Sequence, residues 1–212
     1  GRRPLRLGSA VKKFIAVAGN MGVGKTSLVQ FLHKRYGLEP VWEPYINNPY
    51  LDDFYKDMKS WGFHSQLFFL THKFQLHMEL NRASTTCVQD RTIYEDAEIF
   101  ATNLYRSRKM SKRDYETYIT LYRTMSTALQ PPDLVIYLRC SVRAIRKRIK
   151  QRGRTSEQEI PARYLRRLNG LYEEWIEGWD QSPVMVWDSE NMDYLTDLAD
   201  RIEFQRNIER FL

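Results

Sequence analysis

The sequence predicts an α/β protein with a five-stranded parallel sheet and helices on both faces. Short apolar segments rich in β-branched residues alternate with longer segments whose apolar residues recur at helical spacing. This alternation indicates right-handed β-α-β crossovers, which build parallel sheets covered on both sides. The 212 residues, of which 42% are hydrophobic, are typical of a folded protein. We expect a flexible basic tail, or a remnant of cloning, over residues 1–10 and one domain over residues 11–212.

The order of strands and helices follows from local signals. Pro131 and Pro132 exclude a helix before the apolar run that follows them, and Ser141 is a typical helix N-cap. In the first half we expect a strand at 12–19, a helix from Lys25 to Gly37, a strand at 39–44, a helix at 49–81 and a strand at 85–90. In the second half we expect helices at about 94–105 and 111–129, a strand at 131–138, a helix after Ser141, a helix at about 161–179, a strand at 182–187 and a final helix.

A glycine-rich segment, GNMGVGKTS, follows the first predicted strand and precedes a predicted helix. Its spacing, Gly19-x-x-x-x-Gly24-Lys25-Thr26, is that of a P-loop, whose backbone N–H groups bind phosphate oxygens. The lysine adds a positive charge, and the threonine hydroxyl is a ligand for Mg²⁺. The sequence therefore predicts binding of MgATP. The predicted nucleotide-binding residues are Gly19, Asn20, Met21, Gly22, Val23, Gly24, Lys25, Thr26 and Ser27.

Charged residues close the second and third predicted strands. Glu43 ends one, and Asp90 and Arg91 end the other, so all three are expected at the same edge of the sheet as the P-loop. A hydroxyl nucleophile must lose its proton during attack, so we interpret Glu43 as the catalytic base. Arg91 is expected to hold this carboxylate ionised and to reach the acceptor oxygen. Asp90 is predicted to organise the metal ion together with Thr26.

The stretch RKRIKQRGRTSEQEIP, from Arg146, is strongly basic. Arg148 and Arg152 are four residues apart, hence on one helix face, and Arg154 follows Gly153 on a loop. Arginines near a γ-phosphate stabilise the charge of the transition state. We therefore predict a lid that carries these three catalytic arginines and closes over the triphosphate.

Composition also argues against several partners. The net charge of +7 is concentrated near the N-terminus and between Arg139 and Arg167, which is unlike a uniformly basic nucleic-acid-binding protein. No apolar run approaches the ~20 residues that span a bilayer, so no membrane partner is expected.

Cys87 and Cys140 form no C-x-x-C pattern, and we expect free thiols in a reducing compartment, the cytoplasm.

Several segments in this order resemble the deoxynucleoside kinases, especially the bacterial deoxyadenosine/deoxyguanosine kinases. They are GNMGVGKTS, WEP, NPYLDDFY, WGFHSQLFFLTHKF, QDRTIYEDAEIFA, PPDLVIYL and RIKQRGRTSEQEIPARYL. The resemblance implies a P-loop kinase fold with an arginine-rich lid, and a homodimer. It implies transfer of the γ-phosphoryl group of MgATP to the 5′-hydroxyl group of a deoxynucleoside. Deoxyadenosine is the first candidate, and deoxyguanosine and deoxycytidine are further ones.

The resemblance also implies roles for single residues in the nucleoside site. Tyr55 and Glu157 are similar to the pair that binds the sugar 3′-hydroxyl group, and Gln66 is similar to the residue that pairs with the base edge. Asp96 resembles the acceptor for an exocyclic amine. Further implied residues are Phe100 and Trp61 as apolar walls, and Asp188 near the donor base. Lys73 stands where the purine and cytosine kinases usually have arginine, which leaves the base preference open.

The sequence is compatible with three alternative functions. A nucleoside-monophosphate kinase of the thymidylate type needs a cation for the acceptor phosphate, which Glu43 would repel. A non-catalytic subunit that keeps the kinase fold would be expected to lose Lys25, Glu43 or Arg91, and all three are present. A nucleic-acid-dependent ATPase is suggested by the positive charge alone. The aromatic residues Tyr172, Trp175 and Trp179 are predicted to lie in the core or at a helix–helix interface.

Overall fold

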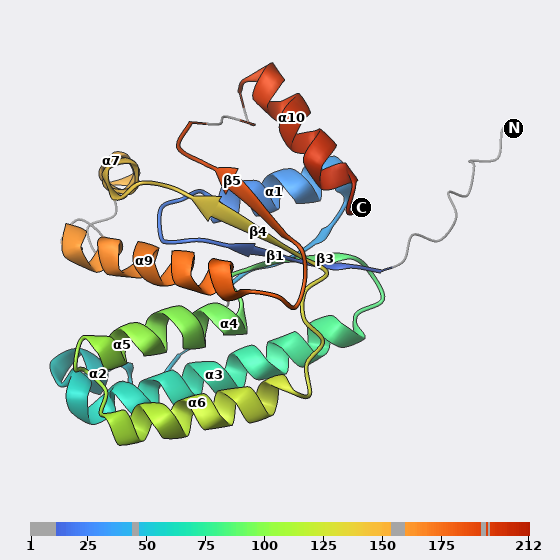
Figure 1. Cartoon of the computed structure of the whole chain (residues 1–212). Coiled ribbons are helices and arrows are strands. Elements are labelled where there is room, and N and C mark those ends of the chain that lie inside the picture. Colours follow the sequence, from blue (N-terminus) through green and yellow to red (C-terminus); the bar gives the residue numbers. More distant parts are fainter. Residues whose placement is uncertain (1–11, 44–46, 154–159, 192–193, 195) are drawn as a thin grey trace, which may run out of the picture.

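The parallel sheet predicted from the sequence is present, in the strand order β2-β3-β1-β4-β5 (Figure 1). This computed structural model describes residues 12–43, 47–153, 160–191, 194 and 196–212. The strands are β1 (Phe14–Ala18), β2 (Glu39–Val41), β3 (Cys87–Asp90), β4 (Leu134–Arg139) and β5 (Val184–Asp188). Each strand lies within a few residues of its predicted bounds. Because all five run in the same direction, their carboxyl ends share one edge of the sheet.

Helices cover both faces of the sheet, as expected. Figure 1 shows α1 and α10 on one side, and α9, α4 and α5 on the other, with α3 and α6 as an outer layer. The helices near the first face are α1 (Lys25–Tyr36), α7 (Val142–Arg152) and α10 (Leu198–Glu209). The others are α2 (Leu51–Lys56), α3 (Met58–Arg82), α4 (Ile93–Glu95), the π-helix η1 (Asp96–Ala101), α5 (Thr102–Arg106), α6 (Lys112–Ser126) and α9 (Ala162–Gly178).

The two faces of β1 bury side chains of different size. Ile15 and Val17 belong to a core cluster shared with α1, α7 and α10, whereas Ala16 and Ala18 pack in a second cluster with α3, η1, α6 and α9. Side chains alternate between the faces of a strand, so this fully buried strand reads as continuously apolar. The alanines allow the helices of the second face, which carry most of the site described below, to approach β1 closely.

Two predicted helices are interrupted in the structure. The helix expected at 49–81 divides at Asp57, whose extended backbone (φ −148°, ψ 86°) ends α2 and whose carboxylate caps α3 by accepting from the Ser60 N–H group. The helix expected at 94–105 contains η1, and the Thr102 hydroxyl group donates to the carbonyl oxygen of Ala97, five residues earlier. π-Helical turns often mark functional sites, and this one carries Asp96.

The two cysteines, Cys87 and Cys140, are buried and free, which confirms that they form no disulfide. Among the described residues, no helix is both long enough and apolar enough to cross a lipid bilayer.

Candidate active site

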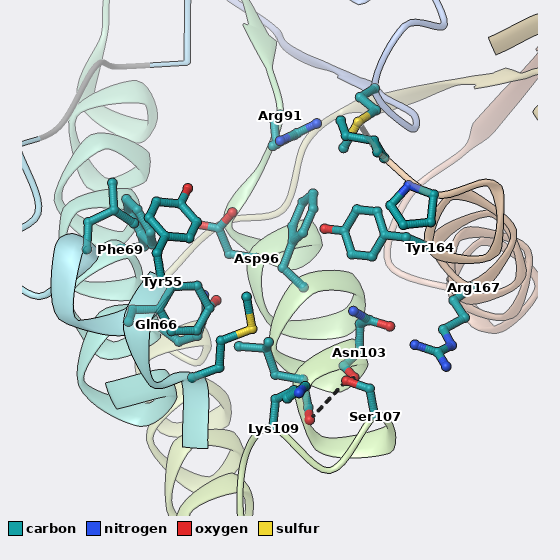
Figure 2. Close-up of a pocket in the computed structure, with 18 of the residues that line it drawn as sticks. Tyr55, Gln66, Phe69, Arg91, Asp96, Asn103, Ser107, Lys109, Tyr164 and Arg167 are labelled. Carbon is teal, nitrogen blue, oxygen red and sulfur yellow. Dashed lines mark hydrogen bonds between the residues drawn. The ribbon is translucent and has the colours of Figure 1, made fainter. Parts of the chain in front are cut away.

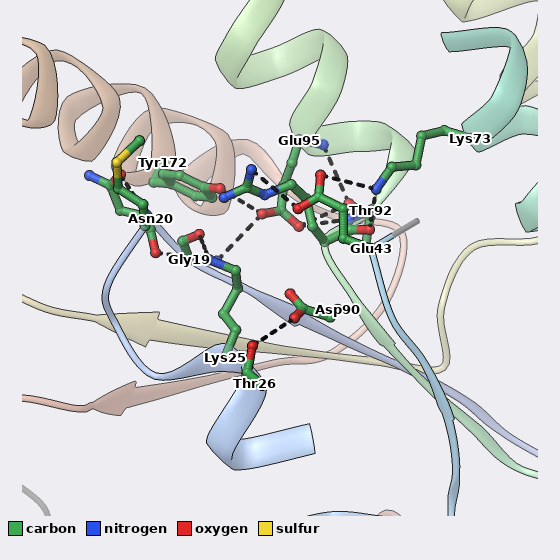
Figure 3. A network of polar contacts seen from close by, with 12 residues as sticks. Gly19, Asn20, Lys25, Thr26, Glu43, Lys73, Asp90, Thr92, Glu95 and Tyr172 are labelled. Atoms are coloured by element: carbon green, nitrogen blue, oxygen red, sulfur yellow. Dashed lines mark hydrogen bonds and ion pairs between the residues drawn. The ribbon is translucent and has the colours of Figure 1, made fainter. Parts of the chain in front are cut away.

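The P-loop lies between β1 and α1 and closes on itself through Lys25 (Figure 3). Lys25 Nζ donates hydrogen bonds to the carbonyl oxygens of Gly19 (2.7 Å) and Asn20 (2.9 Å). Burial lowers the pKa of this ammonium group to about 8. A side chain at Gly19 would bring its Cβ within 2.7 Å of Val23 and 3.0 Å of the Leu138 carbonyl oxygen, so only glycine fits. The loop therefore holds its positive charge where the motif places phosphate oxygens.

Thr26 and Asp90 form a polar corner between the start of α1 and the end of β3. Their oxygens Oγ1 and Oδ2 are 3.4 Å apart, and Asp90 Oδ1 is buried with no hydrogen-bond partner in the described part of the chain. A buried carboxylate oxygen without a partner is unfavourable unless another group completes the site. Hydroxyl and carboxylate oxygens are ligands that Mg²⁺ prefers, and this ion keeps other positions for phosphate and water. The donor set thus suits such a cation.

Glu43, just past the end of β2, lies between two cations (Figure 3). Its Oε1 atom is 3.8 Å from Lys73 Nζ, and its Oε2 atom is 3.5 Å from Arg91 Nη1. The Glu43 side chain is 42% exposed, whereas those of Lys73 and Arg91 are 3% and 15% exposed. The arrangement is a partly open carboxylate with one largely enclosed cation near each oxygen. A carboxylate in this position can accept the proton of a hydroxyl group that enters the site.

A cavity of about 870 Å³ opens beside Glu43 and Arg91, between α2, α3, η1 and α9 (Figure 2). Its polar lining includes Gln66 and Asp96, both buried. Its apolar lining includes Leu51, Phe54, Met58, Phe69, Phe100 and Leu104. The lining also includes the charged residues Glu43, Lys73, Arg91, Arg163 and Arg167. Apolar walls combined with polar groups that can orient a ligand suit a small aromatic molecule.

Asp96 projects into the cavity from η1 (Figure 2). Burial raises the pKa of its carboxyl group to about 7, although the positive charge of Lys73 opposes this shift. Within the described residues, no hydrogen bond or ion pair reaches the Asp96 side chain. A buried carboxyl group without a partner has its hydrogen-bonding capacity available for a ligand.

Comparison with known proteins identifies the site. Residues 15–212 match the family of deoxynucleoside kinases. This chain belongs to the deoxynucleoside kinase family. It is 41% identical over 185 residues to a deoxyadenosine/deoxycytidine kinase of Bacillus subtilis (strain 168), covering 86% of this chain and 85% of the relative. It is 36% identical over 198 residues to a deoxyguanosine kinase of Lactobacillus acidophilus, covering 88% and 85%.

Solved structures agree with this assignment. The deoxyadenosine kinase of M. mycoides in complex with dATP superposes with a TM-score of 0.76 at 33% identity, over 93% of this chain and 99% of that one. The same enzyme with the products dCMP and dCDP gives a TM-score of 0.76 at 32% identity, over 94% and 100%. The P-loop kinase fold and the deoxynucleoside 5′-kinase activity expected from the sequence are therefore confirmed.

Trp61 and Tyr55, both predicted to contact the nucleoside, do not lie deep in the cavity. Trp61 does not line the cavity of the kinase. It packs beside Phe54, Leu104 and Met110, and its ring stacks on Tyr50 with 5.9 Å between the ring centroids. The apolar wall predicted there is formed by other side chains. Tyr55 does reach the cavity, at its rim, and is 66% exposed. Its predicted partner Glu157 lies outside the described residues.

The predicted lid is described in part. Arg148 does not face open solvent above the P-loop. Its guanidinium group donates to the carbonyl oxygen of Val23 (3.1 Å) and to that of Ser189, so it ties the P-loop to the segment after β5. Arg152 is exposed on the last turn of α7, and Arg154 lies outside the described residues. Asp188 ends β5 and accepts hydrogen bonds from Asn191 and from two backbone N–H groups.

Helix α9 contributes residues that the sequence did not assign to the site. Tyr164 and Arg167 line the acceptor cavity (Figure 2). On the other side of α9, the Tyr172 hydroxyl group donates to Glu95 Oε2 (2.6 Å), and the same oxygen is 3.5 Å from the Gly19 N–H nitrogen (Figure 3). Asn169 Oδ1 accepts from Asn20 Nδ2 (2.8 Å). The helix thus borders both the acceptor cavity and the P-loop.

The sequence contains a partial signal for Glu95, the residue that Tyr172 contacts. Thr92 and Glu95 have the spacing of a capping box, and the structure confirms this cap, with Glu95 Oε1 accepting from the Thr92 N–H group (3.0 Å). That motif predicts a local helix start and says nothing of the second oxygen. Tyr172, predicted to lie in the core or at a helix–helix interface, is buried in a core cluster, but its hydroxyl group contacts a residue 77 positions away in the sequence.

Proposed function

We propose that this kinase transfers the γ-phosphoryl group of MgATP to the 5′-hydroxyl group of deoxyadenosine, with deoxyguanosine and deoxycytidine as further acceptors. The main support for this proposal is the position of Glu43. Its two carboxylate oxygens form ion pairs with Lys73 and Arg91, and the residue borders the acceptor cavity. A neutral nucleoside in this cavity presents its primary hydroxyl group to a base rather than to a phosphate-binding cation. The identity to a deoxyadenosine/deoxycytidine kinase supports the choice of base.

The donor half of the proposal assigns the P-loop to the triphosphate. Lys25 and the loop N–H groups bind the phosphates, and Thr26 and Asp90 would hold a Mg²⁺ ion, which would supply positive charge beside the phosphates. Arg148 is proposed to shape the P-loop through Val23, and Arg152 and Arg154 to act from the lid. Asp188 is assigned to the donor-base side because it ends the strand beside β4.

The acceptor half of the proposal assigns hydrogen bonding to Gln66 and Asp96. The Gln66 amide can pair with a base edge through one donor and one acceptor. Ionised Asp96 can accept from the amino group of adenine or cytosine, which thymine lacks. Phe69 and Phe100 supply apolar walls, and Tyr55, with Glu157, is proposed for the sugar 3′-hydroxyl group.

The assembly and location are further parts of the proposal. We propose a homodimer in the cytoplasm. The free thiols of Cys87 and Cys140 suit a reducing compartment. Leu121, 38% exposed on the outer helix α6, is a candidate dimer contact. Sedimentation equilibrium of the purified protein is expected to give twice the chain mass of 25.4 kDa.

The test of the proposed reaction is Glu43→Gln, with Glu39→Gln, at the exposed start of β2, as the matched control. We expect Glu43→Gln to lower kcat by about 10²-fold or more for every deoxynucleoside while ATP still binds, since one general base contributes factors of about 10² to 10⁴. Retention of near wild-type turnover would show that Glu43 is not the base. Preference for another deoxynucleoside over deoxyadenosine in the wild-type kinase would overturn the proposed choice of base.

A further inference from the structure

Lys73 is a buried cation whose contacts differ from those expected for a base-recognition residue. Its Nζ atom donates a hydrogen bond to the carbonyl oxygen of Arg91 at 2.8 Å and lies 3.8 Å from Glu43 Oε1. The structure shows no hydrogen bond or ion pair from Lys73 to Asp96 among the described residues. Both direct contacts of the ammonium group therefore lie on the catalytic side of the cavity (Figure 3).

The hydrogen bond to Arg91 acts on a backbone that is itself unusual. Arg91 has φ = +61°, in the left-handed region that non-glycine residues rarely adopt. This conformation directs the guanidinium group so that it lies 4.7 Å from the centroid of the Phe100 ring and 3.5 Å from Glu43 Oε2. Such a conformation persists only where surrounding contacts hold it. The Lys73 ammonium group, on α3, holds the carbonyl group of this residue.

The charge of Lys73 matters because Glu43 also faces negative groups. From other elements, the carboxyl groups of Asp96 of η1 and Glu95 of α4 and the neutral phenol of Tyr172 of α9 face this region, and Lys25 of the P-loop and Arg91 face it as cations. Lys25 is engaged by the P-loop carbonyl groups and, during turnover, by phosphate. Lys73 and Arg91 are therefore the cations that remain beside the Glu43 carboxylate while the 5′-hydroxyl group attacks.

We propose that Lys73 is a positioning residue for phosphoryl transfer, which holds Arg91 and the Glu43 carboxylate in their working geometry, and that it does not select the base. The inference rests on the proposed role of Glu43. In the step itself, the 5′-oxygen forms a bond to the γ-phosphorus, the bond from that phosphorus to the bridging oxygen of ADP breaks, and the hydroxyl proton passes to Glu43. Lys73 keeps its proton throughout.

The test compares Lys73→Met with wild type on deoxyadenosine, deoxyguanosine, deoxycytidine and thymidine at saturating ATP. We expect kcat to fall by about 10- to 100-fold, by a similar factor for each nucleoside, because one charge contact to the carboxylate is lost in every case. The ratios of kcat/KM between nucleosides are expected to stay within about threefold of wild type. Lys73→Arg, which keeps the charge, is expected to recover part of kcat.

A second readout separates loss of charge from a general distortion. In a double-mutant cycle, adding Lys73→Met to Glu43→Gln is expected to lower kcat little further than Glu43→Gln alone, because Lys73 acts through the Glu43 carboxylate. A general distortion of the site would make the two losses add. Circular dichroism and the Kd for ATP, both expected to match wild type, serve as folding controls, and Lys73→Gln replaces Lys73→Met if that variant does not fold.

Two outcomes overturn the inference. If kcat is retained and the nucleoside ratios change by about tenfold or more, Lys73 reads the base. If the losses from Lys73→Met and Glu43→Gln add fully and Lys73→Arg recovers nothing, the residue has a structural role alone. Either result leaves the Glu43→Gln experiment unaffected, so failure of this inference and failure of the proposed function can be told apart.

Discussion

The two halves of the active site are built in different ways. The donor loop is one continuous segment, residues 19–27, whose lysine bonds to carbonyl groups of the same loop. The acceptor cavity is assembled from α2, α3, η1 and α9 and from the segments that follow β2 and β3. In the donor loop, the side chain of Lys25 is held by hydrogen bonds to its own loop. In the acceptor cavity, the buried carboxyl group of Asp96 has no protein partner among the described residues.

This difference indicates how each half responds to substitution. The triphosphate is common to every reaction that the kinase catalyses, so a change in the donor loop is expected to reduce all of them equally. The acceptor cavity discriminates by hydrogen bonds to the base, and a change there alters the difference in binding free energy between nucleosides. A substitution in the donor loop should thus lower the rate with every nucleoside by a similar factor. A substitution in the cavity should change the relative rates with different nucleosides.

The largest expected effect is that of Lys25→Met. Loss of the ammonium group removes the charge that stabilises the transferring phosphoryl group, so we expect kcat/KM to fall by about 10³-fold for every nucleoside. Steady-state kinetics with two different nucleosides measures this, with Lys34→Met on the exposed end of α1 as the control. A fall confined to one nucleoside would break the distinction between the two halves.

The donor loop also predicts a pH dependence. The pKa of Lys25 is lowered to about 8 by burial in the free protein, so its ammonium form is lost as the pH rises through about 8. A bound triphosphate favours the charged form and therefore raises that pKa. Linkage then requires the KM for ATP to increase above pH 8, and to do so equally for all acceptors.

The next effect in size is that of Asp96→Asn, which is expected to change the preference between nucleosides more than the overall rate of phosphoryl transfer. The amide can donate to the guanine O6 atom and loses the carboxylate acceptor for the adenine amino group. We expect the ratio of kcat/KM for deoxyguanosine over deoxyadenosine to rise by about 10- to 100-fold, at 1.4 kcal/mol per factor of ten. Competition between the two nucleosides in one reaction measures the ratio. An equal loss for both would contradict the role of Asp96 at the base.

The raised pKa of Asp96 gives the same prediction without a mutation. Burial raises it to about 7, so lowering the pH through 7 protonates the carboxyl group and should favour deoxyguanosine in the wild-type kinase. For stability, the folded protein retains this proton between about pH 4 and about pH 7 while the unfolded chain loses it. This group therefore makes the ligand-free protein less stable as the pH rises across that window. Asp96→Asn should raise the Tm at pH 8 and leave it unchanged at pH 4.

The same division explains what the sequence could predict. Strands and helices have local signals, and the P-loop motif specifies both spacing and context, so Gly19 to Ser27 lie where expected. The cavity depends on which faces of distant helices meet, and Trp61 illustrates the limit. Its place in a resembling motif suggested an apolar wall, but the break at Asp57 orients α3 so that Trp61 packs on Tyr50 and His64. Phe54 and Phe69 line the cavity instead.

The contact between Tyr172 and Glu95 was beyond the sequence for a related reason. A capping box accounts for one oxygen of Glu95 locally, while the other is reached by a hydroxyl group from α9. Only the packing of α9 on the sheet brings these atoms together. The link is also where the two halves of the site meet, because α9 lines the acceptor cavity through Tyr164 and Arg167.

The smallest effect, and the sharpest test of how separate the halves are, is expected for Tyr172→Phe. The variant removes the 2.6 Å hydrogen bond to Glu95 and leaves the buried ring in place. A hydrogen bond to a charged group contributes about 1.5–3 kcal/mol, so we expect a lower Tm. Because the same Glu95 oxygen faces the Gly19 N–H group at 3.5 Å, we expect the KM for ATP to rise about three- to tenfold with kcat nearly unchanged.

Tyr137→Phe is the matched control for that variant. Tyr137 also donates to a glutamate of α9, Glu173, at 2.9 Å, but among the described residues Glu173 makes no hydrogen bond to the P-loop and keeps Arg139 as a partner. Its loss should leave the KM for ATP unchanged. If Tyr172→Phe raises the KM for the nucleoside as much as that for ATP, α9 transmits changes between the two halves, and the donor loop is not the self-contained unit that its internal hydrogen bonds indicate. If the KM for ATP alone rises, α9 supports the P-loop on one face and lines the cavity on the other as two independent tasks.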